Sequence, residues 1–195
     1  MSALADHRVL VLAAGRGRRM GEPKALMPVD GAPWWRRQER SMRAAGARSL
    51  WVVSPDVEAA MADSDAAPTE RVCASPDAPM FESIVTGLRA LAPSPPAGVF
   101  ILPVDVPAPS APTLARLTTG PSVAVPRSNG RTGHPIWLDW GWVREHLLTT
   151  TPAARRLDLL IKADATPVDV DDDAVAWNLN TPADLAAWQA RSVEE

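Results

Sequence analysis

A glycine-rich segment at residues 12–24 combines the residue types that bind phosphate groups. It reads Leu-Ala-Ala-Gly-Arg-Gly-Arg-Arg-Met-Gly-Glu-Pro-Lys. Gly15 and Gly17 allow the backbone to turn sharply and to direct its N–H groups at phosphate oxygens. Arg19 and Lys24 add positive charge, because arginine grips two oxygens at once and lysine acts as a compact point charge. The segment therefore predicts a site for the triphosphate of an NTP.

Two familiar phosphate-binding motifs do not describe this segment. A dinucleotide-binding fingerprint requires glycine three places after Gly17, where Met20 stands. A Walker loop requires Gly-Lys-Ser/Thr, whereas Lys24 lies between Pro23 and Ala25. The remaining alternative is an ordinary glycine-rich turn with solvated arginines. It is disfavoured by the added residues Arg19, Met20, Gly21, Pro23 and Lys24.

An aspartate placed directly after an apolar run is the first candidate metal ligand. Asp105 follows residues 99–102 and Pro103, which lacks the amide needed to continue a strand. Mg²⁺ in proteins is commonly held by one or two carboxylates together with substrate phosphates and water. The alternative is a turn aspartate that precedes Pro107.

Short apolar runs alternate with helical patterns along the chain. The predicted strands cover residues 8–12, 49–53, 99–102, 122–125 and 166–169. The predicted helices cover residues 34–45, 83–91, 111–117, 142–148, 153–162 and 181–190. This alternation predicts a single α/β domain over residues 1–195, with a mainly parallel central sheet and helices on both faces. Ligands of such folds bind at the carboxyl ends of the strands, here after Leu12, Val53 and Leu102.

Composition narrows the classes of partner and the compartment. The net charge of −3 argues against a nucleic-acid or membrane-surface partner, because both require a basic field. Cys73 is the only cysteine, so an internal disulfide is excluded and a reducing, cytoplasmic location is expected. No apolar run reaches the roughly 18 residues of a membrane-spanning helix.

The glycine-rich segment resembles the signature of the nucleotidyltransferases that are similar to molybdenum cofactor cytidylyltransferases and guanylyltransferases. That signature is Leu-Ala-Ala-Gly-x-x-x-Arg-Met-Gly-x-Pro-Lys, and it matches at every fixed position. The resemblance covers residues 9–188 and implies a Rossmann-like domain of the nucleotide-diphospho-sugar transferase type. It assigns Arg19 and Lys24 to catalysis at the triphosphate. It also assigns the following residues to nucleotide binding: Leu12, Ala13, Ala14, Gly15, Gly17, Arg19, Lys24 and Ser83.

The same resemblance implies roles for residues beyond the glycine-rich segment. Asp105 and Asn180 would hold Mg²⁺, with Asn178 left open as a further ligand. Ser83 would lie near the base and ribose; the alternative is a helix N-cap. His134, in a Gly-His-Pro element, would lie on the acceptor side; the alternative is a structural histidine.

These assignments imply transfer of a nucleoside monophosphate from an NTP to a phosphorylated small molecule, with release of pyrophosphate. Ala13-Ala14 favours CTP, because guanylyl-transferring relatives tend to carry Ala-Gly-Gly. Molybdopterin is the favoured acceptor, which would make a molybdoenzyme or its chaperone a partner. The alternatives are a sugar- or alditol-phosphate nucleotidyltransferase, a nucleotide-binding protein without turnover and, with less support, a nicotinamide-dependent oxidoreductase. Trp34-Trp35 replaces leucine-like residues of the relatives, and the sequence assigns this pair no role.

Overall fold

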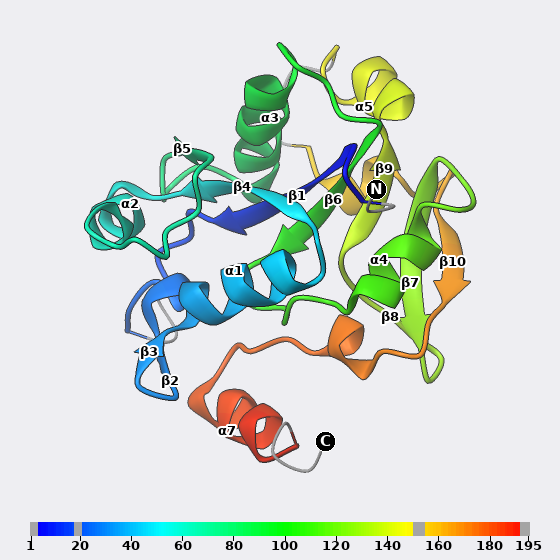
Figure 1. The fold of residues 1–195 in the computed structure, drawn as a ribbon. Helices are drawn as coiled ribbons and strands as arrows, with labels where there is room; N and C mark the ends of the chain where they lie inside the picture. The colour runs from blue at the N-terminus through cyan, green and yellow to red at the C-terminus, as the bar shows by residue number, and fades with distance from the viewer. Residues whose placement is uncertain (1–3, 18–20, 150–154, 192–195) are drawn as a thin grey trace.

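One central sheet organises the computed structural model, which describes residues 4–17, 21–149 and 155–191 (Figure 1). The sheet contains β1 (His7–Ala13), β4 (Arg48–Val53), β5 (Arg71–Cys73), β6 (Gly98–Pro103), β7 (Val123–Ser128), β8 (Arg131–Thr132), β9 (Ile136–Asp139) and β10 (Thr166–Asp169). The strand order is β10-β7-β9-β6-β1-β4-β5, and β8 pairs with β7. A separate hairpin joins β2 (Pro28–Val29) and β3 (Ala32–Pro33).

The helices follow the strands in alternation. They are α1 (Trp34–Ala44), α2 (Pro55–Ala62), α3 (Met80–Leu91), α4 (Ala111–Leu117), α5 (Trp140–His146), α6 (Leu157–Leu160) and α7 (Pro182–Arg191). Two short 3₁₀ helices complete the set, η1 (Lys24–Leu26) and η2 (Asp173–Ala176). Within the described ranges, no helix is long and apolar enough to cross a membrane.

The pairing of the strands confirms the prediction of a mainly parallel sheet. β1 is parallel to both β4 and β6, β4 is parallel to β5, and β10 is parallel to β7. β9 runs antiparallel to β6 and β7 and was not predicted. Its four residues are too few for a clear apolar run, and they directly follow the Gly-His-Pro element.

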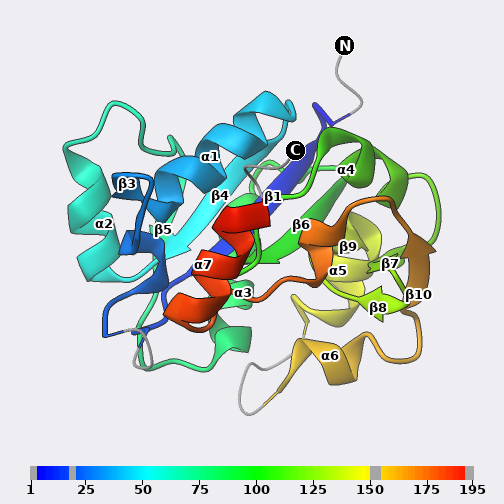
Figure 2. The same cartoon turned by 90° about the horizontal axis from the view of Figure 1, so that it is seen from below.

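Helices cover both faces of the sheet, as the sequence predicts. Along β1, Val9 and Val11 point to one core, whereas Leu10 and Leu12 point to the other. The first core lies under α1, α2, α4 and α7, and Figure 2 shows α1, α4 and α7 on that side. The second core lies under α3, α5 and α6. Strands buried on both faces are continuously apolar, which is why these runs were recognisable in the sequence.

Two helices differ most from the predictions. α2 was missed because Pro55 was taken only as the end of a strand, whereas Ser54 caps this helix and Pro55 occupies its first turn. The side-chain oxygen of Ser54 accepts a hydrogen bond from Val57 N at 3.4 Å. The helix predicted over residues 153–162 is reduced to the four residues of α6, and residues 153–154 of that prediction lie outside the described chain.

Candidate functional site

The carboxyl ends of β1 and β6 bring the glycine-rich segment next to Asp105. The two strands are paired in parallel, with Leu12 opposite Pro103, and Val104 N donates to the carbonyl of Leu12 at 3.1 Å. A pocket of about 220 Å³ opens at this edge of the sheet. The predicted site residues that line it are Leu12, Ala14, Gly15, Gly17, Lys24, Ser83 and Asp105. The structure therefore gathers most of the predicted residues around one hollow.

Two of the residues predicted to bind the nucleotide stand apart from this group. The side chain of Ala13 is buried in the core on the other face of β1 and does not line the pocket. Arg19 lies outside the described residues, because positions 18–20 are not among them. Its predicted contact with a triphosphate stays a prediction.

Lys24 joins the two proposed metal ligands. Its Nζ donates to Asp105 Oδ2 at 2.7 Å and to Asn180 Oδ1 at 2.7 Å. The side chains of Lys24 and Asp105 are only 19% and 20% exposed. Two oxygen donors from distant parts of the chain thus converge on one cationic nitrogen. Oxygen is the ligand that Mg²⁺ and Mn²⁺ accept from carboxylates and amides, so this pair fits such an ion.

The backbone around Asn180 fixes its approach to Asp105. Leu179 is fully buried, and its N–H donates to the carbonyl of Asp105 at 2.8 Å. The next turn forms a reciprocal cap, since Asp184 N donates to Thr181 Oγ1 at 3.1 Å and Thr181 N donates to Asp184 Oδ2 at 2.8 Å. Hydrogen bonds from Thr181 lead the causes that hold the pKa of Asp184 below its ordinary value. By contrast, Asn178 is exposed and lines a separate hollow.

Gly15 and Gly17 of the phosphate segment differ in the space around their Cα atoms. Gly17 has φ +60°, and a Cβ there would lie 1.8 Å from the carbonyl oxygen of Glu22, so only glycine fits. A Cβ at Gly15 would meet nothing within 4 Å, which leaves the backbone at Gly15 accessible to a ligand. Arg16 forms an ion pair with Asp77, with Nε to Oδ1 at 2.6 Å. This pair ties the glycine-rich segment to the opposite wall of the pocket.

That opposite wall was not predicted from the sequence. It consists of Ser75, Pro76, Ala78 and Met80, which connect β5 to α3. The turn-forming residues after a strand were the available signal, but β5 is only three residues long and was not recognised. α3 starts at Met80, three residues earlier than predicted, with Pro79 at its N-cap. The alternative of Ser83 as an N-cap is therefore wrong.

His134 lies beside the pocket at the start of β9. Its Nδ1 is buried and has no hydrogen-bond partner among the described residues. Burial lowers the pKa of His134 and outweighs two opposing effects, a hydrogen bond with the backbone of Ile101 and the charge of Asp105. His134 is therefore neutral at pH 7.

His134 also lines a second pocket of about 370 Å³, which shares Leu12, Met80 and Pro103 with the first. Its walls are largely apolar and consist of Phe81, Ile84, Ile101, Ile136 and Leu157. Arg155 and Arg156 add positive charge, although Arg156 is paired with the exposed Asp158 at 2.8 Å. Neither arginine was singled out from the sequence, because nothing in the sequence links them to the pocket.

The acidic run at residues 169–173 organises neighbouring loops. Asp169 pairs with Arg127, with Oδ1 to Nε at 2.6 Å. Asp172 accepts hydrogen bonds from Ser110 N at 2.9 Å and Thr113 Oγ1 at 2.7 Å. Asp169 and Asp172 thus have partners within the protein, and the described residues hold no cluster of three or more His, Cys, Asp or Glu side chains suited to a metal.

We predict that the buried His134 makes the fold less stable in mild acid. Its pKa is lowered by folding, so below about pH 6.5 the unfolded chain binds a proton that the folded chain does not. Stability is therefore retained above that pH and falls as the pH drops through it. In urea titrations at pH 7.5 and 5.5, His134→Asn should lose less stability than the unaltered protein.

His7 provides the comparison for this experiment. Burial also lowers its pKa, so His7→Asn should reduce the acid loss in the same direction. If His134→Asn lost as much stability between the two pH values as the unaltered protein, the imidazole would not be held neutral by folding.

Comparison with known proteins places this arrangement among nucleotide-transferring domains. A family model described as the MobA-like NTP transferase domain matches residues 9–166. No curated protein matches the sequence.

Solved structures share the fold over nearly the whole chain. A homologue of Mycobacterium tuberculosis Rv0371c from Mycobacterium sp. strain JC1 is 22% identical with a TM-score of 0.78, over 97% of this chain and 98% of the other. Rv0371c itself has been solved as a complex with manganese.

Two further structures carry names that state an activity. A nucleotidyl transferase from Methanothermobacter thermautotrophicus is 22% identical, with a TM-score of 0.74 and coverage of 96% and 98%. The 2-C-methyl-D-erythritol 4-phosphate cytidylyltransferase of Thermus thermophilus is 20% identical, with a TM-score of 0.68 and coverage of 95% and 98%. At these identities the likeness establishes the fold and not the activity.

Proposed function

This chain belongs to the MobA-like NTP transferase family, and on that premise we propose that it transfers a nucleoside monophosphate from an NTP, with CTP preferred, to a phosphorylated acceptor. Molybdopterin is the proposed acceptor, and pyrophosphate is the second product. One observation carries the proposal: Lys24, Asp105 and Asn180 meet beside the glycine-rich segment, where a triphosphate would lie.

We assign the metal to the oxygens of Asp105 and Asn180. Enzymes of this family are metal-dependent, and Mg²⁺ is our proposal for this chain. A cation bound there would neutralise charge on the triphosphate and on the departing pyrophosphate. The chain's own groups would contribute to the same stabilisation, with Lys24 as a point charge and the backbone N–H groups around Gly15 as donors. Arg19 is proposed to act with them on the triphosphate.

The reaction follows from this placement of charge. An oxygen of the acceptor phosphate attacks the α-phosphorus of the NTP in line with the pyrophosphate leaving group. The new bond joins the acceptor oxygen to the α-phosphorus, and the bond from that phosphorus to the pyrophosphate oxygen breaks. No general base is required, because a phosphate is already ionised at neutral pH. The protein contributes position and electrostatic stabilisation.

The preference for CTP rests on Ala14 rather than on Ala13. Ala14 lines the pocket, whereas the side chain of Ala13 is turned into the core. A methyl group at position 14 narrows the space beside the base. A smaller pyrimidine suits this space better than a guanine, which supports CTP over GTP.

The second pocket supports an acceptor with a flat, ring-shaped body. Its walls are mostly aliphatic and aromatic, and it adjoins the triphosphate pocket through Leu12 and Pro103. Such walls suit the flat faces of a pterin better than a polyol chain. A ring can place its faces against apolar atoms and keep its polar edge toward charged groups or water, whereas the hydroxyls of a polyol point in several directions and lose their hydrogen bonds to water. Arg155 is the candidate partner for the acceptor phosphate. A molybdoenzyme or its chaperone would then receive the product.

A polyol phosphate is retained as the alternative acceptor. The Thermus enzyme with the same fold bears the name of a methylerythritol phosphate cytidylyltransferase. A nucleotide-binding protein without turnover is less well supported, because Asp105 and Asn180 both meet Lys24 at the phosphate segment instead of pointing away from it.

The decisive assay measures pyrophosphate release from CTP, GTP, UTP and ATP with Mg²⁺, each with and without molybdopterin. We expect release from CTP only when molybdopterin is present. Mg²⁺-dependent nucleotide binding without any release would contradict the acceptor, and a parallel assay with methylerythritol phosphate would then test the alternative. The absence of binding for all four nucleotides would overturn the proposed function.

A further inference from the structure

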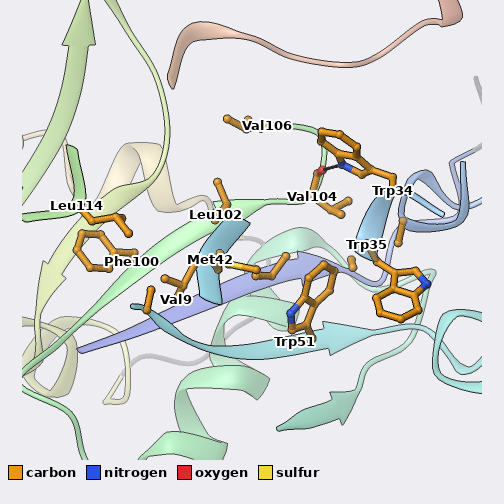
Figure 3. Close-up of a cluster of buried hydrophobic side chains, with 14 of the residues drawn as sticks. Val9, Trp34, Trp35, Met42, Trp51, Phe100, Leu102, Val104, Val106 and Leu114 are labelled. Carbon is orange, nitrogen blue, oxygen red and sulfur yellow. Dashed lines mark hydrogen bonds between the residues drawn. The ribbon is translucent and has the colours of Figure 1, made fainter. Parts of the chain in front are cut away.

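Two side chains of α1 form hydrogen bonds with the loop that carries Asp105. Trp34 Nε1 donates a hydrogen bond to the carbonyl of Val104 at 2.6 Å, and this bond is drawn in Figure 3. Gln38, one helical turn further on, donates from Nε2 to the carbonyl of Val106 at 2.6 Å and to that of Val104 at 3.2 Å. The carbonyls one residue before and one residue after Asp105 are thus both bound by α1.

Gln38 also receives a hydrogen bond from the same loop. Its Oε1 accepts from Ala108 N at 2.7 Å. Trp34 and Gln38 are each only 1% exposed. A buried amide or indole N–H costs free energy unless it is paired. Loss of these hydrogen bonds would therefore be unfavourable for both side chains. The loop is therefore fixed through its peptide groups, which leaves the Asp105 carboxylate free to face Lys24.

Trp34 additionally contacts the segment that carries the second proposed ligand. Its ring packs edge-on against Trp188 of α7, with centroids 5.1 Å apart and planes at 85°. α7 begins two residues after Asn180, and Leu179 N donates to the carbonyl of Asp105 at 2.8 Å. One indole ring therefore contacts both the loop that holds Asp105 and the helix that follows Asn180.

We propose that Trp34 and Gln38 are positioning residues that set the Asp105 and Asn180 oxygens at the spacing a divalent cation requires. This inference rests on the proposed function, in which these oxygens bind the metal. It gives Trp34 a role that the leucine-like residues of the relatives lack, because leucine has no N–H to donate. Outer partners of metal ligands commonly change metal affinity by about 10- to 100-fold when they are removed.

The neighbouring residue provides a matched control. Trp35 is also 1% exposed and lies in the same core, but its Nε1 has no hydrogen-bond partner among the described residues. Trp34→Phe and Trp35→Phe thus remove the same atoms from adjacent buried positions. Only the first removes a hydrogen bond to the Asp105 loop, so a difference between them isolates the positioning effect from simple loss of packing.

The test measures Mn²⁺ affinity by electron paramagnetic resonance, with a non-hydrolysable CTP analogue present, beside the free energy of unfolding. We expect both variants to lose stability, and only Trp34→Phe to weaken Mn²⁺ binding, by about tenfold. Turnover of Trp34→Phe should recover toward the unaltered value as the metal concentration rises, which damage to the fold would not allow. Equal Mn²⁺ affinity in the two variants would overturn the inference.

Two further variants distinguish failure of the positioning role from failure of the proposed function. Gln38→Met keeps an unbranched side chain of similar length but removes every hydrogen bond to the loop, and we expect it to weaken Mn²⁺ binding at least as much as Trp34→Phe. Asp105→Asn reports on the ligand itself. If Asp105→Asn left Mn²⁺ affinity unchanged, Asp105 would not be a ligand, and both the metal assignment and the positioning role would fall.

Discussion

Replacing Lys24 with methionine is expected to lower turnover by about a hundredfold or more, because the charge that we propose acts on the transferring phosphates is lost. The same change is expected to strengthen the binding of a bare divalent cation. In the structure the ammonium of Lys24 stands between Asp105 and Asn180, at 2.7 Å from each. A metal ion and this ammonium cannot share those oxygens, since like charges at such distances repel by several kcal/mol.

Lys24→Met is thus expected to lower turnover and to raise cation affinity, and a general loss of folding would lower both. We expect Mn²⁺ affinity without nucleotide to rise by about tenfold, a gain well below the repulsion of about 4 kcal/mol between two unit charges 4 Å apart near a protein surface. The measurements are pyrophosphate release and Mn²⁺ titration on the same preparation. Lys162, the only other lysine, is exposed, and Lys162→Met should leave both quantities unchanged. Weaker Mn²⁺ binding in Lys24→Met would contradict the exchange of cations.

Asp105→Asn is expected to reduce turnover by about a hundredfold or more, because the negative charge of the proposed metal ligand is lost. Asparagine has nearly the same shape, and its oxygen can still accept the hydrogen bond from Lys24, so the fold should persist. The reduction should appear together with weaker Mn²⁺ binding in the presence of nucleotide. Asp65→Asn, at an exposed position remote from this pocket, is the control for a change of net charge. Turnover near the unaltered value in Asp105→Asn would exclude Asp105 as the metal ligand.

The main architecture could be predicted because the central strands are buried on both faces. β1, β4 and β6 appear in the sequence as apolar runs that end at glycine or proline, and that pattern does not depend on distant contacts. α2 and β9 were missed for local reasons. A proline that follows a strand can stop it or begin a helix, and a four-residue antiparallel strand leaves too short a pattern to recognise.

The residues of the candidate site also differ in how far the local sequence reveals them. Lys24 and Asp105 were identifiable because their chemistry is local to a motif and to a strand end. Asn180 depended on the resemblance to a family, since an asparagine before a capped helix has an ordinary structural explanation. The support from Trp34 and Gln38 was not predictable, because it consists of contacts between residues that are 70 and 68 positions apart in the chain. The position of Arg19 stays a prediction.

The contact between Lys24 and Asn180 spans 156 positions of the chain, and this span has a consequence for synthesis and for heating. A protein chain emerges from the ribosome with its N-terminal part first, so the phosphate segment and most of the sheet can fold while Asn180 is still missing. With Asn180 as the proposed metal ligand, activity would then arise only when Asn180 and the following α7 dock, as the last step of maturation. Trp188 is the one buried residue of α7, with Leu185 partly buried against the same core, and an element with so few buried residues opens at lower free-energy cost than the sheet. Moderate warming would therefore switch the enzyme off reversibly while its core remains intact.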